Sequence, residues 1–235
     1  MGSDPTQLQE LHLRRCSRRS LLKTTLLALL PWQVLAGQQA RSAVAYPETL
    51  AALERAYQRE MEAHRRYLKS ASKAKVEGYK GVAYLFTAFA ASELIHAQNF
   101  QRIAVSLGGN FQTNAVPIPL AGTKQNLITA ANDEIDTIDK LYPETLKRLE
   151  RESHSEAIAY VRYALASEKQ HREIIERVQR YTESFFDRVV KAIDEMTSHY
   201  FVCQVCGSTV RQKPAGNCAI CNSPSSNYRR IAAPV

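Results

Sequence analysis

The chain of 235 residues contains few of the residues that interrupt helices, with only 9 glycines and 9 prolines. Such low numbers exclude collagen-like and low-complexity chains. No glycine occurs at 38–77 or at 123–206, and several cluster between these stretches and beyond them. Long glycine-free stretches separated by clusters of glycine are typical of long helices joined by short connections.

We expect four long helices and a further helical piece, at 47–76, 81–107, 123–152, 153–180 and 182–198. Apolar residues recur at intervals of three and four in the first of them, as an amphipathic helix requires. Pro143 lies inside the third and should kink or break it. Strand-type alternation is absent before residue 200. The sequence therefore predicts an all-α four-helix bundle followed by a tail of roughly 35 residues.

Cysteine and tryptophan are also scarce, with 5 and 1 residues. Five cysteines are too few for a disulfide scaffold in a chain of this length. Cys16 and Trp32 both lie in an N-terminal segment that differs from the rest of the chain. This segment, residues 1–45, contains six basic and two acidic residues and thus carries half of the net charge of +8.

The order of residues in this segment is typical of a signal peptide. A basic stretch with Arg18 and Arg19 precedes the short apolar run 24–30, and the small residues Ala43-Val44-Ala45 follow. The paired arginines resemble a twin-arginine export signal, with cleavage after Ala45. The protein would then be exported, to the periplasm or an equivalent compartment. An uncleaved basic helix or a signal anchor is the alternative interpretation.

The remainder of the chain carries a charge of only +4 and contains no basic cluster interleaved with aromatic residues. This pattern argues against a nucleic-acid partner. The apolar run 24–30 is too short to span a bilayer as a helix. We therefore expect no stable membrane insertion once the leader is removed.

Two of the expected helices carry the same Glu-x-x-His pattern, at Glu93–His96 and at Glu168–His171. Positions three apart lie on one face of a helix, so each pair can offer a carboxylate and an imidazole to one metal ion. Both pairs follow apolar or small residues, which indicates a location at the core. A buried carboxylate without a partner is very costly, and a bound cation would offset that cost.

The other two helices each offer one carboxylate on the apolar stripe. In the first, Glu60 follows apolar residues at intervals of three, four and seven, whereas Glu62 should be solvated. In the third, the same intervals select Glu134 over Asp133 and Asp136. Two Glu-x-x-His helices and one glutamate from each remaining helix make the di-iron carboxylate arrangement. The predicted ligands are Glu60, Glu93, His96, Glu134, Glu168 and His171.

The tail contains two Cys-x-x-Cys pairs, Cys203 with Cys206 and Cys218 with Cys221. Four thiolates in this spacing predict one tetrahedral metal site, and a segment this short needs a metal to hold its fold. Gly207 and Asn222 follow the pairs and tolerate the left-handed backbone that turns N–H groups toward sulfur. The spacing does not separate iron from zinc. Two disulfides are the alternative in an exported chain.

From about residue 48 to 230, the chain resembles the rubrerythrin family. The resemblance implies a ferritin-like di-iron bundle at 46–198 and a rubredoxin-like iron domain at 199–235. It also implies that Tyr67 and Tyr142 donate hydrogen bonds to ligand carboxylates. A further implication is a head-to-tail homodimer that brings one chain's rubredoxin iron near the other's di-iron site. The matching segments are Glu60–Tyr67, Phe86 with Glu93–Ala97, Asn126-Leu127 with Glu134, Leu141–Pro143, Glu168–His171 and both cysteine pairs.

The chain departs from this family at Thr137, where rubrerythrins usually carry another glutamate three residues after Glu134. In the family, that glutamate is associated with an iron that shifts between ligands as its redox state changes. Threonine cannot replace an anionic ligand, and Asp136 lies about 100° away around the helix. We therefore expect six protein ligands, as in ferritins.

The resemblance implies a non-haem di-iron oxidoreductase that reduces hydrogen peroxide to water in oxidative stress defence. Electrons would come from an unidentified donor through the rubredoxin-type Fe(Cys)₄ centre. One alternative is a ferroxidase or iron-handling protein, which Thr137 favours. Two others are a di-iron oxidase or oxygenase acting on O₂ or an organic substrate, and a non-catalytic protein with zinc in the tail.

Overall fold

The structure, a computed structural model, describes residues 45–114, 116–179 and 199–234. The predicted leader, apart from Ala45, and the predicted helical piece 182–198 lie outside these residues. The boundary between the two predicted domains, at 198–199, therefore remains a prediction. Within the described part of the chain, no helix is both long and apolar enough to cross a membrane.

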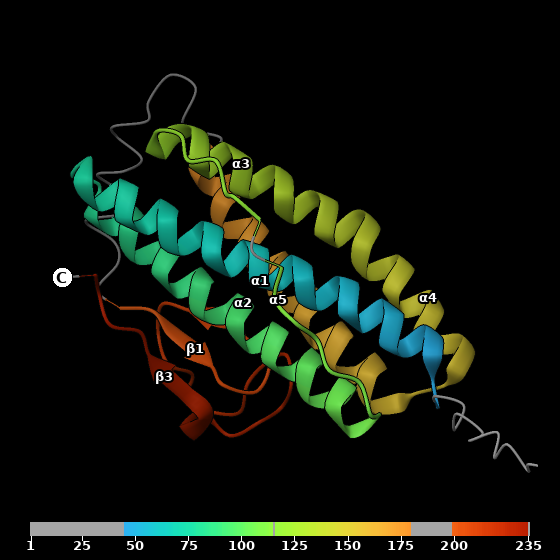
Figure 1. The fold of residues 1–235 in the computed structure, drawn as a ribbon. Helices are drawn as coiled ribbons and strands as arrows, with labels where there is room; N and C mark the ends of the chain where they lie inside the picture. The colour runs from blue at the N-terminus through green and yellow to red at the C-terminus, as the bar shows by residue number, and fades with distance from the viewer. Residues whose placement is uncertain (1–44, 115, 180–198, 235) are drawn as a thin grey trace, which may run out of the picture. The chain divides into compact units, whose positions relative to one another are not determined.

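Among the described residues, five α-helices build a four-helix bundle (Figure 1). They are α1 (Pro47–Val76), α2 (Lys80–Ser106), α3 (Thr123–Asp136), α4 (Tyr142–Glu152) and α5 (Ser155–Gln179). Helices α3 and α4 follow one another along a single rod. The connecting segments 107–114 and 116–122 run along the length of the bundle (Figure 1). The predicted all-α bundle is confirmed, and one long crossover connection of this kind is typical of ferritin-like folds.

The rod formed by α3 and α4 is not a continuous α-helix, because five residues between them, Thr137–Leu141, form a π-helical turn. Pro143, in the first turn of α4, has no backbone N–H to donate, and its ring crowds the carbonyl four residues earlier. The backbone widens just before the proline, so that the N–H of Tyr142 bonds to the carbonyl of Thr137. The predicted break at Pro143 thus takes the form of a π turn, a feature that is frequent at functional sites.

The bundle has two apolar clusters, one at each end, with a polar layer between them. On α1 the first cluster includes residues from 52–57 and the second includes residues from 67–74, and Glu60 lies between the two clusters. On α2 the clusters likewise flank Glu93 and His96. This layering means that the buried acids have apolar packing both above and below them.

The C-terminal part forms a three-stranded antiparallel sheet of strand order β2-β1-β3. Its strands are β1 (Phe201–Cys203), β2 (Thr209–Val210) and β3 (Tyr228–Arg230), with a short 3₁₀ turn, η2 (Ser225–Asn227), before β3. The core of this module consists of cysteines and Tyr228 rather than a large apolar cluster. A module with so little apolar core needs a metal or a partner surface to hold its fold.

The two apolar clusters should dominate the stability of the bundle. Phe100 of α2 is fully buried in one of them, and Val105 on the same helix is 58% exposed. Replacing a buried Phe by Ala costs about 3–5 kcal/mol through lost transfer energy and the cavity left behind. We expect Phe100→Ala to lower the free energy of unfolding of the metal-free protein by that amount, measured by denaturant titration of helical circular dichroism. Val105→Ala should change it by less than about 0.5 kcal/mol, and equal effects would contradict this assignment of the core.

Candidate metal centres

The structure brings together all six predicted bundle ligands, which come from four helices. Each is buried, with no more than 4% of its surface exposed. Helix α1 supplies Glu60, and α3 supplies Glu134. Helix α2 supplies the pair Glu93 and His96, and α5 supplies the pair Glu168 and His171.

The six side chains form two overlapping groups of four. One group contains Glu60 and His96, the other contains Glu134 and His171, and both contain Glu93 and Glu168. Within each group the potential ligand atoms lie within 4.8 Å of one another. Two such groups that share two carboxylates have the layout of a dinuclear site with bridging carboxylates.

The distances show which carboxylates lie between the two histidines. Glu93 places Oε2 at 3.0 Å from Nδ1 of His96 and Oε1 at 3.2 Å from Nδ1 of His171. Glu168 places Oε1 and Oε2 each at 3.1 Å from the same two nitrogens. Both glutamates therefore present one oxygen to each half of the site. Glu60 belongs only to the half that contains His96, and Glu134 only to the half that contains His171.

Without a bound cation, the negative charge of this buried layer is reduced by the uptake of protons. Burial, and then the negative charge of Glu168, raises the pKa of Glu60 to about 8. Burial opposes a charged His171, but the neighbouring Glu93 and Glu168 outweigh it and raise its pKa to about 9. Burial likewise opposes ionisation of Glu168, yet hydrogen bonds from His171 and His96 hold its pKa well below the usual range. A metal ion binding here must displace protons.

Glu93 gives the clearest sign that the site fits metal ions. Both of its carboxylate oxygens are buried. Within the described residues neither accepts a hydrogen bond of good geometry, although each faces an imidazole nitrogen, at 3.0 and 3.2 Å. Ligation would satisfy both atoms, since a carboxylate can bind one metal through each oxygen. A donor set of carboxylate oxygens and imidazole nitrogens suits iron, among other transition metals.

Two tyrosines orient Glu60 and Glu134, the glutamates that each belong to only one half of the site. The hydroxyl of Tyr67 donates to Oε1 of Glu134, and that of Tyr142 donates to Oε1 of Glu60 at 2.6 Å. Burial, with the nearby carboxylates, raises the pKa of each tyrosine well above its ordinary value. Both phenols therefore stay protonated as donors, and the hydrogen bonds that the family resemblance implied are present.

The four tail cysteines also form one group, with their sulfur atoms within 4.8 Å of one another, and none is in a disulfide. Gly207 and Asn222 follow the two pairs with φ of 80° and 57°, the left-handed backbone that the sequence predicts. The N–H of Gly207 returns to the carbonyl of Cys203, and that of Asn222 to the carbonyl of Cys218, each at 2.9 Å. Two like turns thus face one another across a four-sulfur site.

The thiols of this group are strongly coupled in the metal-free protein. A hydrogen bond from Cys206 lowers the pKa of Cys203 to about 4, and the same bond raises the pKa of Cys206. One thiolate is thus already stabilised, as metal ligation requires. A tetrahedral S₄ set suits iron or zinc.

The cysteine module contacts the bundle at the outer side of both histidines. Nε2 of His96 lies 3.1 Å from the carbonyl oxygen of Cys206, and Nε2 of His171 lies 3.2 Å from Oγ1 of Thr209. Ser92 donates to the carbonyl of Gly207 at 2.7 Å. A side chain on Gly207 would place its Cβ 2.3 Å from Nε2 of His96, so only glycine fits here.

Three buried polar neighbours of the ligands were not predicted from the sequence: Ser92, Ser167 and Thr209. The first two precede the two Glu-x-x-His pairs and lie 3.3 Å apart at the centre of the bundle. A repeated Ser-Glu-x-x-His pattern was therefore the available signal for both serines. Nothing in the local sequence marks Thr209, because its contact joins segments 38 residues apart.

Thr137, where the family resemblance predicts a departure from the usual ligand set, is buried and faces α1. Its hydroxyl donates to the carbonyl of Asp133 at 2.9 Å and accepts from Nε of Arg59 at 3.2 Å. Arg59 also donates to the carbonyl of Asp133. The hydroxyl is thus held by the backbone of α3 and by a guanidinium.

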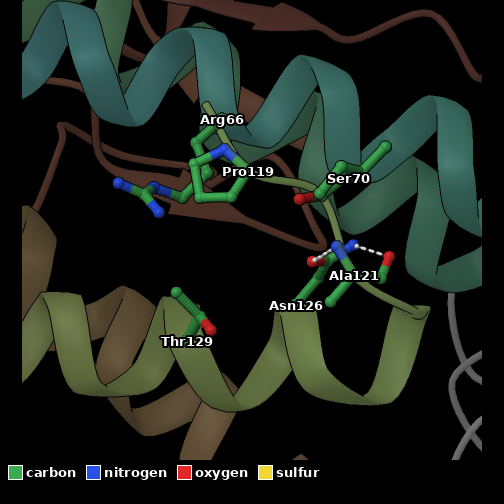
Figure 2. Close-up of a pocket in the computed structure, with 7 residues that line it drawn as sticks. Arg66, Ser70, Pro119, Ala121, Asn126 and Thr129 are labelled. Carbon is green, nitrogen blue, oxygen red and sulfur yellow. Dashed lines mark hydrogen bonds between the residues drawn. The ribbon is translucent and has the colours of Figure 1, made fainter. Parts of the chain in front are cut away.

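A separate pocket of about 180 Å³ lies between α1 and α3, beside the loop 119–121 (Figure 2). Asn126 closes one wall by a pair of hydrogen bonds with the backbone of Ala121. Arg66 lines the opposite side, but its guanidinium already pairs with Glu62 and Asp133. The pocket therefore offers no free charge for a ligand and contains none of the predicted metal ligands.

Fold and geometry define a four-helix bundle with a dinuclear carboxylate–histidine site and an attached four-cysteine module. Comparison with known proteins agrees. The rubrerythrin family model matches residues 51–179. The chain belongs to the rubrerythrin family.

Individual relatives match over most of their length. Nigerythrin of Nitratidesulfovibrio vulgaris is 30% identical over 190 residues, which cover 80% of this chain and 89% of the relative. Rubrerythrin-2 of Clostridium acetobutylicum is 29% identical, covering 75% and 93%. A solved structure of fully reduced nigerythrin aligns with a TM-score of 0.66 at 26% identity, over 83% of this chain and 91% of that one. A bacterioferritin from Desulfovibrio desulfuricans shares the bundle fold, with a TM-score of 0.58 at 20% identity over 62% of this chain and 86% of that one.

Because the two ligand groups overlap, substitution of different glutamates should remove different numbers of bound metal ions. Glu93→Ala should abolish binding of both bundle metals, because Glu93 belongs to both groups. Glu134→Ala should leave one bundle metal bound, because Glu134 belongs to only one group. Metal content per chain, measured by mass spectrometry after loading and desalting, reports both results.

Glu62 offers a matched control on α1, since it is partly exposed and pairs with Arg66. Glu62→Ala should retain the full metal content. Equal metal loss in Glu93→Ala and Glu134→Ala would show that the two groups do not act as a dinuclear site.

Proposed function

We propose that this protein is a non-haem di-iron oxidoreductase that reduces hydrogen peroxide to water, with electrons relayed from an Fe(Cys)₄ centre. The reaction consumes two electrons and two protons for each peroxide and yields two waters. The six ligand side chains would hold a pair of ferrous ions, which would provide one electron each and Lewis-acid stabilisation of the developing charge. Membership of the rubrerythrin family and the two ligand groups support the proposal.

Under this proposal each bundle residue has a defined task. Glu93 and Glu168, which belong to both groups, would hold both ions. Glu60 and His96 would complete one half of the site, and Glu134 and His171 would complete the other. Tyr142 and Tyr67 fix the orientation of Glu60 and Glu134 through their hydroxyl donors. The apolar clusters on either side keep bulk water from the layer.

The single observation that carries the electron relay is the contact between Cys206 and His96. Cys206 belongs to the four-sulfur group, and its carbonyl accepts a hydrogen bond from Nε2 of His96 at 3.1 Å. The opposite nitrogen of that imidazole faces the bundle carboxylates. One backbone segment, one hydrogen bond and one ring therefore connect the two sites.

A second candidate function is ferroxidase or iron handling, and the environment of Thr137 favours it. The hydroxyl of Thr137 is engaged by Arg59 and by the carbonyl of Asp133. Position 137 thus supplies no additional carboxylate, which leaves six protein ligands at the bundle site. Such a fixed ligand set is what we expect of a ferritin-type centre.

We also propose that the protein works as a homodimer with an unidentified electron donor. The contacts between module and bundle described above lie within one chain. In a head-to-tail dimer, exchange of residues 199–235 between partners would reproduce the same contacts from chain to chain.

The relay is tested by placing zinc at the four cysteines and iron in the bundle, because zinc has no redox chemistry. After chemical reduction, this hybrid should reduce one equivalent of peroxide as fast as the all-iron protein. Sustained turnover with reduced rubredoxin as donor should fall to background in the hybrid alone.

Full turnover by the zinc hybrid would contradict the relay. Fast ferrous oxidation with growth of a large ferric core, in place of peroxidase turnover, would select the ferroxidase function.

A further inference from the structure

Both imidazoles of the bundle site have their outer nitrogens turned toward the cysteine module. Nε2 of His96 faces Cys206, and Nε2 of His171 faces Thr209. Cys206 and Thr209 lie on either side of Gly207-Ser208 in the chain. The inner nitrogens, Nδ1 in both rings, face the bundle carboxylates. One four-residue turn therefore contacts both potential metal-binding histidines.

The outward hydrogen bonds show which nitrogen of each ring keeps its proton when a metal ion binds. The carbonyl of Cys206 can only accept, so Nε2 of His96 must donate. The hydroxyl of Thr209 is 3.1 Å from the carbonyl of Gly207 and donates to it. Its lone pairs are then free to accept from Nε2 of His171 at 3.2 Å. In both rings Nδ1, which faces the bundle carboxylates, is therefore the nitrogen that gives up its proton when a metal ion binds.

We propose that Thr209 is a positioning residue for the bundle metal centre. Its hydroxyl holds His171 in the tautomer and orientation that ligation by Nδ1 requires. The cysteine module is then a structural part of the bundle site, in addition to its role as an electron relay. This inference rests on the proposed function in so far as it needs the bundle to bind a metal pair.

The surroundings of Thr209 keep its hydroxyl in place. Thr209 is 3% exposed and pairs with Val202 in the antiparallel ladder of β1 and β2. Ser208 beside it donates to Oε1 of Gln170, the neighbour of His171, at 3.0 Å. Backbone pairing on one side and a bond to α5 on the other thus fix the distance between Thr209 and His171.

The test compares three variants. Thr209→Val keeps the side-chain shape but removes the acceptor, and Thr209→Ser restores it. Thr145→Val removes a buried hydroxyl that has no hydrogen-bond partner among the described residues. Loss of such an outer partner typically weakens metal binding about 10–100-fold. The full-length protein is loaded with zinc at all sites, and a chelator titration measures release of the bundle ions. Cadmium substituted at the cysteines gives a thiolate absorption band that shows whether the module is folded in each variant.

We expect Thr209→Val to weaken one bundle ion about 10–100-fold, with near-normal affinity in Thr209→Ser and Thr145→Val. In ¹⁵N spectra of the zinc protein, the protected Nε2–H signal of His171 should be lost in Thr209→Val, while that of His96 remains. Wild-type zinc affinity together with a retained His171 signal in Thr209→Val would overturn the inference. Failure of the wild-type bundle to bind any metal pair would overturn the proposed function as well, so the two failures are distinguishable.

Discussion

The constraint on which the rest of the structure depends is the burial of four carboxylates in one layer of a helical bundle. Each is almost fully excluded from water. Unpaired charges in such surroundings are very costly, and in the metal-free protein the layer offsets them by proton uptake, which raises the pKa of Glu60 to about 8. Two divalent cations would replace those protons and leave Glu93 with no unsatisfied oxygen. The apolar clusters on both sides, the two buried tyrosines and the π turn before Tyr142 all serve to hold this layer.

The second organising feature is the close contact between the bundle and the cysteine module. Gly207 is required because a side chain would collide with His96. Its left-handed backbone also completes the turn around Cys203 and Cys206, so that one residue serves both centres. A single turn of the chain therefore both shapes the four-sulfur site of the module and contacts the histidines of the bundle site.

Local periodicity accounts for what the sequence could predict. Helical spacing separates Glu60 from Glu62, and the structure buries the first while the second pairs with Arg66 at the surface. The same reasoning separates Glu134 from Asp136, which is exposed and pairs with Lys140. Spacing could not predict the π turn, because Pro143 requires a break but does not determine its form. Nor could it predict that Thr209 contacts His171 or that Arg59 engages Thr137, since these contacts depend on how distant segments pack.

Under the proposed function, a dinuclear iron site and an Fe(Cys)₄ centre coexist in one chain. The most direct measurement is the metal content of the isolated protein together with its visible spectrum. We expect two irons in the bundle and one at the cysteines, with the red colour of an iron–thiolate centre that bleaches on reduction. Zinc at the cysteines, or a bundle that binds no iron pair, would contradict it.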